Sequence, residues 1–584
     1  MRLLVLYGSQ TGTAQDVAEQ IWRESHLLGF QGPVLSFEEY ETHRLIEESL
    51  VVFVVATTGD GVEPDNMKQA WRFLLKRSLP AQSLQGMQFA CLGLGDSSYP
   101  KFNYAAKKLH KRLLNLGAAA VCPVGLCDDQ HDYGHLGVSL AWTKDLWIAL
   151  KGISGVNDSQ LNGGQDQSTG KWQLKTLPKE SAFASLETLL WTQKQPAYAF
   201  KLKDNQRTTA ENHFQDVRFL KLEYQAEGLS WEPGDVIDVQ PQNSENTVNE
   251  FFDLLQEHNL NFDEDTVVEV ASAHPDMPLP KAYATPLSLR QAAKYVWDLS
   301  AKPRQRFLEV LGFNCSDEME KEKLDEFCSG EGIDDLVAYV NRPRRTILEV
   351  LQDFRHATSC LTLEQLFEMM PLIQPRSFSI ASDVSSGTLD LLVAVVNYKT
   401  IMHTPRLGLC SNWLKQLEAG TTEIRGVLKK GTMVWPNDLS IPLIMVGPGT
   451  GIAPFRSIIQ NRLQAQSTGS VIGPLVVFFG CRNKSSDFHF QEDFTTWTTT
   501  KQVEAHFAFS RDEDHKVYVQ HLITKNGPHL AGLIKNHNAF IYVAGNSNNM
   551  PKSVREAFIE ILGGDADYVD LMIKQRRYQE ETWA

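Results

Sequence analysis

Long apolar runs are missing from this 584-residue sequence: no stretch approaches the roughly 20 residues that a helix needs to span a bilayer. The chain opens on a strand-like segment without the basic leader of a signal peptide. A net positive charge is missing too, because 71 acidic residues outnumber 56 basic ones and give a formal charge of -15. We therefore expect a soluble cytoplasmic protein with no membrane anchor and no nucleic-acid partner, suited to a partner with a basic patch.

Paired cysteines are also missing. The sequence has no Cys-x-x-Cys pair and no histidine at the spacing of a zinc site. We therefore expect reduced thiols and no metal centre in the chain. The eight cysteines are scattered singly, at Cys91, Cys122, Cys127, Cys315, Cys328, Cys360, Cys410 and Cys481.

What the sequence does contain is an alternation of short apolar runs with helix-like segments, over residues 1–150 and again over 437–584. This rhythm predicts a doubly wound parallel sheet in each. Residues 151–190 begin with a stretch rich in Gly, Ser, Asn and Gln, which predicts a flexible linker. Strand alternation closed by Pro-Gly and Asp turns predicts an antiparallel barrel over 191–436, with a helical insert at about 245–370.

A phosphate-loop lysine is absent from the turn that follows the first strand. Residues 6–16 read LYGSQTGTAQD, whereas a nucleoside-triphosphate loop ends in Gly-Lys-Ser or Gly-Lys-Thr. Hydroxyls and turn amides at a helix N-terminus favour an anion through free N–H groups and the helix dipole. The turn therefore predicts a site for one terminal phosphate, which carries about -1.5 to -2 charges.

Two further loops follow later strands of the same predicted sheet: ATTGDG at residues 56–61 and LGLGDSSYPKFN at 92–103. All three loops fall at carboxyl ends of strands, where ligands of doubly wound sheets bind. Each alone could be only a tight turn. In this order, however, they resemble the flavodoxin-like FMN-binding domain.

That resemblance implies that the first loop holds the FMN phosphate and that the other two line the flavin ring. Tyr99 would stack on one ring face, and Asp129 in CDDQHDYG would contact the flavin. Thr58 departs from the family, whose members often have Tyr or Phe there, so FMN could be held less tightly or at a different potential. The implied FMN residues are Ser9, Gln10, Thr11, Gly12, Thr13, Ala14, Ala56, Thr57, Thr58, Gly59, Leu94, Gly95, Asp96, Ser97, Ser98, Tyr99, Pro100, Lys101, Phe102, Asn103 and Asp129.

In the barrel region, PRSFSIAS resembles the R-x-Y-S motif of the ferredoxin-reductase family, and GLCSNWL resembles its pyrophosphate turn. The resemblance implies that Arg376 and Ser411 hold the FAD pyrophosphate together with the amides of residues 408–410. Phe378 replaces the motif's tyrosine and keeps only its stacking, and Ser379 would lie near flavin N5. Arg344 is a further candidate, although a solvated basic face is the alternative there. The implied FAD residues are Arg344, Arg376, Ser377, Phe378, Ser379, Gly408, Leu409, Cys410 and Ser411.

A glycine-rich loop, VGPGTGIAPFRS at residues 446–457, follows an apolar strand and opens a helix. Its glycines allow the close approach of a pyrophosphate. The later segment SRDEDHKVYVQ resembles the 2′-phosphate site of NADPH-binding domains, so NADPH should be preferred over NADH; a charged surface loop is the alternative. The implied NADPH residues are Thr450, Ser510, Arg511, Lys516, Val517, Tyr518, Val519 and Gln520.

The chain ends in RRYQEETWA. In diflavin reductases a terminal aromatic covers the FAD ring, and Trp583 matches it; a frayed terminus is the alternative. Ala544 stands where cytochrome P450 reductases have a cysteine, and Glu581 where they have an aspartate. The resemblance therefore implies a catalytic set of Ser379, Glu581 and Trp583, with hydride transfer that relies more on positioning.

Together these motifs resemble the NADPH-dependent diflavin reductases over nearly the whole chain, which implies a multidomain α/β protein with a β-barrel and the cofactors FMN, FAD and NADPH. Electrons would pass from NADPH to FAD, to FMN and to a protein acceptor. The loop at Thr58, AGNSNNMP and the QEETWA end are most similar to members that serve cytosolic iron–sulfur cluster assembly, whose partner is the iron–sulfur protein anamorsin. A methionine synthase reductase, a soluble cytochrome P450 reductase and a redox-inactive scaffold are the alternatives.

Acidic residues accompany the loops that the resemblance assigns to FMN. If electrons leave from FMN, this acidic rim would receive the acceptor protein, and their association would weaken with added salt. The rim comprises Asp60, Glu63, Asp65, Asp96 and Asp132.

Overall fold

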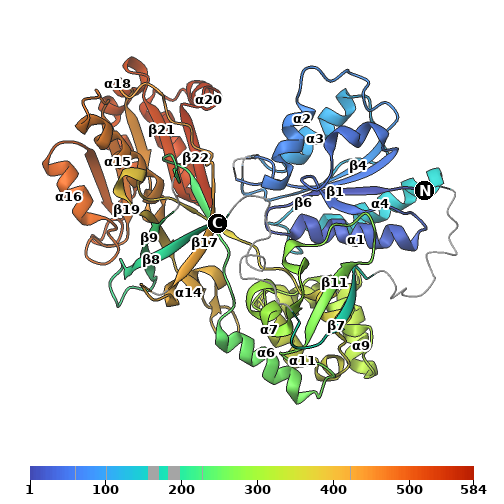
Figure 1. Cartoon of the computed structure of the whole chain (residues 1–584). Coiled ribbons are helices and arrows are strands. Elements are labelled where there is room, and N and C mark those ends of the chain that lie inside the picture. The colour runs from blue at the N-terminus through green and yellow to red at the C-terminus, as the bar shows by residue number, and fades with distance from the viewer. Residues whose placement is uncertain are drawn as a thin grey trace. The chain divides into compact units, whose positions relative to one another are not determined.

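The computed structural model describes residues 1–59, 61–99, 101–154, 170–181, 197–225, 228–420 and 422–583 (Figure 1). Two of the predicted site and rim residues, Pro100 and Asp60, lie outside the described residues, as does most of the predicted linker. The chain forms two compact units, each described here by itself. The first takes its described residues from Met1–Thr192, Gln242–Gln374 and Thr400–His403, and the second from Gln193–Pro241, Pro375–Lys399 and Thr404–Ala584.

The first unit begins with a parallel sheet. Its described strands follow the order β2-β1-β3-β4, and β5 and β6 both pair with β4. Every pairing is parallel, and the strands are nearly continuous apolar runs because helices cover both faces. The strands are β1 (Leu4–Gly8), β2 (Val34–Ser36), β3 (Leu50–Ala56), β4 (Gln88–Gly95), β5 (Ala119–Ala120) and β6 (Gly125–Asp128).

Helices cover the two faces of this sheet, α2 and α3 on one and α1 and α4 on the other, with a buried apolar cluster under each pair (Figure 1). This arrangement confirms the predicted flavodoxin-like domain. The helices are α1 (Thr13–Leu27), η1 (Thr42–Glu47), η2 (Asp65–Met67), α2 (Lys68–Leu74), α3 (Tyr104–Asn115) and α4 (Leu136–Ser154).

A strand lies inside the predicted linker. Strand β7 (Trp172–Leu177) pairs antiparallel with β11 (Val267–Ser272), so the prediction of a flexible linker over 151–190 is wrong for this stretch. The reason is a short alternation that places Trp172 and Leu174 on one face, where both pack against the core of the helical insert. The alternation spans only six residues and the partner strand lies far along the chain, so the strand was not predicted from the sequence.

The helical insert packs short helices around one apolar cluster. Ser244 caps α6 by accepting from the Thr247 N–H, and Thr346 and Thr362 form capping boxes at α11 and α13. The insert comprises α6 (Glu245–Glu257), β11, η4 (Lys281–Tyr283), β12 (Leu287–Ser288), α7 (Leu289–Gln291), η5 (Ala292–Val296), α8 (Gln305–Gly312), α9 (Glu318–Cys328), α10 (Ile333–Leu336), η6 (Val337–Asn341), α11 (Ile347–Asp353), α12 (Arg355–Ser359) and α13 (Leu363–Met369).

The second unit contains the predicted barrel, an antiparallel sheet of order β13-β10-β17-β8-β9-β14. A bridge between Ile380 and Leu391 joins the two edge strands and nearly closes the sheet around its apolar core. The elements are β8 (Tyr198–Arg207), β9 (Val217–Tyr224), β10 (Val236–Val239), β13 (Arg376–Ser379), η7 (Val384–Ser386), β14 (Leu389–Ala394), β15 (Asn397–Tyr398), β16 (Arg406–Leu407), α14 (Leu409–Gln416) and β17 (Glu423–Lys429).

A second parallel sheet, of order β20-β19-β18-β21-β22, completes this unit and confirms the predicted doubly wound domain. Its strands are β18 (Leu443–Val446), β19 (Leu475–Cys481), β20 (Glu504–Phe509), β21 (Phe540–Asn546) and β22 (Tyr578–Trp583). One face is covered by α15 (Ala453–Ser467), which follows η8 (Gly449–Ile452), and by α16 (Gln491–Thr499). The other is covered by α17 (Val519–Lys525), α18 (Gly527–Asn536), α19 (Asn549–Ile561) and α20 (Ala566–Lys574). Among the described residues, no helix has both the length and the apolar character needed to cross a membrane.

Candidate active site

The first predicted FMN loop closes on itself at the end of β1. Ser9 Oγ accepts a hydrogen bond from the Gly12 N–H at 3.0 Å, and the Ser9 N–H donates to Asn66 Oδ1 at 3.0 Å. Gly12, with a φ of 92°, immediately precedes α1 in a conformation that suits only glycine. No side chain of the described chain caps α1, so the N–H groups of its first turn remain available. This set of hydroxyls and amides fits a phosphate group.

The second loop is tied to its neighbours by both threonines. The Thr57 N–H donates to Leu94 O at 2.8 Å, and the Thr57 hydroxyl accepts from the Ala105 N–H at 3.2 Å. Thr58 bridges to Val62, and its hydroxyl donates to Val62 O at 3.3 Å. The one polar side-chain atom of Thr58 is therefore turned back onto its own loop.

The third loop rests on Asn103. This residue is fully buried at a φ of 53°, and its Nδ2 donates to Cys127 O at 2.8 Å. A Cβ added to Gly95 would lie 2.8 Å from Asn103 Oδ1, and the Ser97 N–H donates to Asp128 Oδ1 at 2.8 Å. Asn103 thus supports the loop from beneath.

Sheet topology brings the three loops together. Strands β1, β3 and β4 are neighbours, so their carboxyl ends meet at one edge of the sheet. Asp129 joins them from the end of β6, where its N–H donates to Gly95 O at 2.8 Å. Tyr99 is half-buried in the third loop. All of the described FMN candidates therefore belong to one edge.

The acidic rim beside these loops is partly neutralised. Glu63 lies 3.7 Å from Lys108, and Asp65 lies 2.6 Å from Lys68. Asp132 is exposed. The rim is therefore less acidic than its sequence suggests, because two of its carboxylates face lysines of the same domain.

Strand β13 carries the first group of predicted FAD residues. Ser377 Oγ donates to the buried carboxylate of Asp238, so this side chain supports strand pairing. Phe378 packs against the barrel core. Burial raises the pKa of the Cys410 thiol to about 12, and the nearby Arg376 guanidinium opposes this rise. Phe378 of β13 and Cys410 of α14 both belong to the barrel core, so the two predicted FAD segments pack against the same cluster.

The pyrophosphate turn uses two of its predicted donors internally. The Gly408 N–H donates to Val396 O at 3.0 Å, and the Ser411 hydroxyl donates to Gly408 O at 3.4 Å while its oxygen accepts from the Val396 N–H at 3.0 Å. A Cβ on Gly408 would lie 2.7 Å from the Val396 side chain. Because no side chain of the described chain caps α14, the N–H groups of Leu409 and Cys410 remain as donors that fit a pyrophosphate.

Arg344 stands apart from this group by its place in the chain. It belongs to the first unit, at a φ of 54°, whereas the other FAD candidates all belong to the second.

Three side chains meet at the predicted hydride-transfer site. Ser379 Oγ donates to Glu581 Oε1 at 3.4 Å, and Thr432 Oγ1 donates to Glu581 Oε2 at 2.7 Å. Burial raises the pKa of Glu581, and the hydrogen bonds from Thr432 and Ser379 oppose this rise. The contact unites two of the predicted catalytic residues. It also adds Thr432, which sequence reasoning missed because no motif marks it.

The predicted terminal aromatic, Trp583, is the last residue of β22. It pairs with Asn546 of β21, and its carbonyl accepts from the Ser547 N–H at 2.8 Å. The ring is half-buried against the apolar cluster on the α15 face of the sheet. The backbone of Trp583 is therefore fixed in the sheet, which a frayed terminus would not be.

The glycine-rich loop around Thr450 passes close to other backbone. Gly449 has a φ of 58°, and a Cβ on Gly451 would lie 2.1 Å from Ala544 O. A Cβ on Gly447 would lie 2.7 Å from Gly451 O. Glycine at these positions lets η8 approach β21, and the open loop fits the pyrophosphate of a dinucleotide.

The predicted 2′-phosphate residues divide into two groups. Arg511 and Lys516 are exposed, as ligands of a phosphate must be. Ser510 is buried, and its hydroxyl donates to Cys481 O at 3.3 Å. Val519 is 3% exposed within the core beneath α17. Ser510 and Val519 therefore stabilise the loop, whereas Arg511 and Lys516 are accessible to a 2′-phosphate.

Sequence reasoning missed the residue that fixes this loop. Asp512 accepts from Asn483 Nδ2 at 2.9 Å and from the Lys484 N–H at 3.0 Å, which ties the loop to the one after β19. The acidic residue was itself a signal, because a carboxylate within a phosphate-binding segment is suited to positioning the loop and not to the ligand. Tyr518, which is 40% exposed, directly precedes α17.

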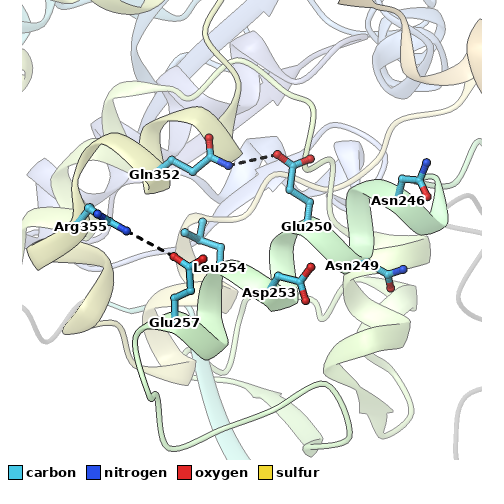
Figure 2. A pocket seen from close by; sticks show the side chains of 8 residues that line it. All are labelled: Asn246, Asn249, Glu250, Asp253, Leu254, Glu257, Gln352 and Arg355. Carbon is cyan, nitrogen blue, oxygen red and sulfur yellow. Dashed lines mark hydrogen bonds and ion pairs between the residues drawn. The ribbon is translucent and has the colours of Figure 1, made fainter.

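One pocket of about 530 Å³ lies elsewhere, in the helical insert between α6 and the α11–α12 segment (Figure 2). Its polar walls pair with each other: Gln352 Nε2 donates to Glu250 Oε1 at 3.2 Å, and Arg355 lies 3.5 Å from Glu257. The pocket contains none of the predicted site residues.

Comparison with known proteins gives a consistent result over the whole length. Three family models match: flavodoxin at residues 5–142, FAD binding domain at 192–413 and oxidoreductase NAD-binding domain at 445–556. Proteins named NADPH-dependent diflavin oxidoreductase 1 align with all of this chain and 99% of their own. Their identities are 42% in Xenopus laevis, 42% in Danio rerio and 34% in Schizosaccharomyces pombe.

Proposed function

Because the chain belongs to the NADPH-dependent diflavin oxidoreductases, which bind FMN, FAD and NADPH, we propose that it carries electrons from NADPH to an iron–sulfur protein of the anamorsin type in the cytoplasm. When bound, the two flavins supply the conversion of a two-electron donor into single-electron steps. The residues of this chain bind and orient the cofactors and hold the protons near them.

The observation that carries the proposal is that each nucleotide site keeps free donors. The first turn of α1 keeps its amides, the turn before α14 keeps two amides, and the loop after β20 exposes Arg511 and Lys516. A redox-inactive scaffold needs none of these. Their presence supports an enzyme that uses all three sites.

Ser379 and Glu581 support hydride transfer by orientation. The Ser379 hydroxyl donates to Glu581, which fixes its rotamer at the end of β13. Thr432 donates to the other carboxylate oxygen and holds Glu581 in place. A serine fixed in this way can present its lone pairs to one position, which is the contribution of a preorganised polar group.

The FMN edge supports a protein acceptor. Its loops include the exposed Ser97, Ser98 and Asp132, while the whole chain carries a net charge of -15. An acceptor with a basic patch would be steered toward this edge, and the steering would weaken with salt.

Mixing the NADPH-reduced holoprotein anaerobically with anamorsin, methionine synthase and a cytochrome P450 tests the acceptor. We expect the fastest electron transfer to anamorsin. Faster transfer to methionine synthase or to the P450 would assign the chain to that acceptor instead.

The exit point is tested with FMN-stripped protein. Removal of FMN should spare ferricyanide reduction by FAD and abolish transfer to anamorsin, and added FMN should restore it. Undiminished transfer without FMN would show that electrons leave from FAD. Absence of flavin bands in the purified protein would support a scaffold.

A further inference from the structure

An arginine of the helical insert contacts the phosphate loop of the flavodoxin-like domain, within the first unit. Arg304 directly precedes α8, and its Nη1 donates to Gly12 O at 2.7 Å. Its Nη2 donates to Thr11 O at 3.4 Å, and the guanidinium lies 3.8 Å from Asp16 Oδ1. One charged side chain therefore holds two successive carbonyls of the loop that the family uses for FMN phosphate.

Holding these carbonyls also orients the opposite side of the loop. The C=O and N–H groups of a trans peptide point in opposite directions. Fixing the carbonyls of Thr11 and Gly12 therefore directs the N–H groups of Gly12 and Thr13 away from Arg304. The Gly12 N–H is directed to Ser9 Oγ, which accepts it at 3.0 Å, and the Thr13 N–H begins the uncapped first turn of α1, where a phosphate finds its donors.

Glycine is required at position 12 for two reasons. Its φ of 92° is strained for residues with a side chain. A Cβ at Gly12 would also lie 2.8 Å from Arg304 Nη2 and would displace the guanidinium. The loop is thus built to admit Arg304.

A surface ion pair with Asp16 does not account for this contact. The separation of 3.8 Å is long, both side chains are partly exposed, and such pairs contribute little. The closest contacts of Arg304 are with the loop backbone, whose geometry determines phosphate binding.

We propose that Arg304 is a positioning residue of the FMN phosphate site, through which the helical insert tightens FMN binding. By linkage, bound FMN strengthens the contact between loop and insert by the same factor. The inference concerns FMN binding alone, so it stands or falls independently of the acceptor proposed above.

Binding of two ligands to FMN-stripped, full-length protein tests the proposal. We expect Arg304→Ala to raise the Kd for FMN about tenfold, the size of one lost hydrogen bond to a charged group. The Kd for riboflavin, which has no phosphate, should stay within twofold. Arg304→Lys keeps the positive charge but loses the two-pronged guanidinium, so its Kd for FMN should lie between those of the unaltered protein and Arg304→Ala. Flavin fluorescence measures both constants.

Arg355→Ala is the matched control, because Arg355 is an exposed arginine of the same insert that pairs with Glu257. It should change neither constant. FAD content and thermal unfolding of each variant report whether the fold is intact. Equal losses for FMN and riboflavin, or an unchanged Kd for FMN, would overturn the proposal.

Discussion

Ala544 on β21 lies in register beside Glu581 on β22. The neighbour of this carboxylate is therefore a methyl group, with no thiol to donate or accept a proton. Glu581 takes its hydrogen bonds from Ser379 and Thr432 instead. The protonation of Glu581 is thus governed by two hydroxyls and by burial, and each can be changed separately.

Thr432→Val removes the shorter of these hydrogen bonds. Because that bond lowers the pKa of Glu581 against the effect of burial, the substitution should raise this pKa further. Whichever protonation state the reaction uses, the limb of the pH profile that Glu581 governs should move to higher pH. Stopped-flow flavin reduction by NADPH across pH measures it.

Thr496→Val, on the exposed side of α16, is the matched control and should leave the pH profile unchanged. If the pH profile of Thr432→Val coincides with that of the unaltered protein, Glu581 does not titrate in this step.

Ser379→Ala should slow flavin reduction by NADPH about fivefold, which is the effect of one lost hydrogen bond.

Arg511 should decide coenzyme choice. A charge-assisted hydrogen bond contributes about 1.5 to 3 kcal/mol, so Arg511→Ala should lower kcat/KM for NADPH by one to two orders of magnitude. NADH has no 2′-phosphate, and its kcat/KM should barely change. Lys574→Ala, an exposed lysine of α20, should affect neither coenzyme. An equal fall in kcat/KM with both coenzymes would mean that Arg511 stabilises the folded domain and does not bind the 2′-phosphate.

We expect Trp583 to stack on the FAD ring, where the nicotinamide ring of the coenzyme must bind before hydride transfer. Displacing Trp583 should then cost about 1 kcal/mol beyond the lost burial, which is the strength of an aromatic stack. NADPH can offset this cost through its 2′-phosphate contacts and NADH cannot. Trp583→Ala should therefore raise NADH-driven turnover far more than NADPH-driven turnover. The substitution keeps the backbone bond to Ser547, which truncation after Thr582 would remove.

The comparison of kcat/KM for both coenzymes decides whether Trp583 must be displaced in this way. A ratio that stays within about twofold of the unaltered protein amounts to less than 0.5 kcal/mol of differential effect. In that case Trp583 only packs against the sheet.

His489 should make stability depend on pH. Burial, at 3% exposure, lowers its pKa to about 4, while Asp487 opposes and His213 adds to the shift. Below about pH 6.5 the unfolded chain takes up a proton that the native imidazole does not, so stability falls as pH falls. From pH 7 to pH 5 this loss is about 2 kcal/mol.

Urea unfolding at both pH values measures the effect. His489→Gln should reduce the loss of stability between pH 7 and pH 5 by about 2 kcal/mol, and His537→Gln, which replaces an exposed histidine, should leave that loss unchanged. A loss in His489→Gln as large as in the unaltered protein would contradict the prediction.

Periodicity predicted the two parallel sheets and the barrel because each depends on local pattern. Apolar runs such as Leu50–Ala56 and Leu475–Cys481 are recognisable without knowledge of their partners. Strand β7 is different, since its pairing with β11 is a long-range contact that no local pattern reveals.

The sequence offers candidate site residues only where a motif marks them. Ser379, Glu581 and Arg511 lie in recognisable segments, whereas Thr432 and Arg304 reach their partners through the fold. Motifs also do not reveal the structural contacts of their residues: the side chains of Asn103, Ser377 and Val519, which belong to matching segments, all contact other parts of the protein.

The interleaving of the insert with the barrel has a consequence for biosynthesis. A ribosome completes α13 while the barrel still lacks β13, β14 and β17, because the insert is encoded between β10 and β13. A nascent chain that stalls at this point carries a finished insert beside β8, β9 and β10, whose edges have no partners. Such edges are templates for pairing with other chains. Premature termination between Met369 and Glu423 should therefore yield aggregates and not a working fragment.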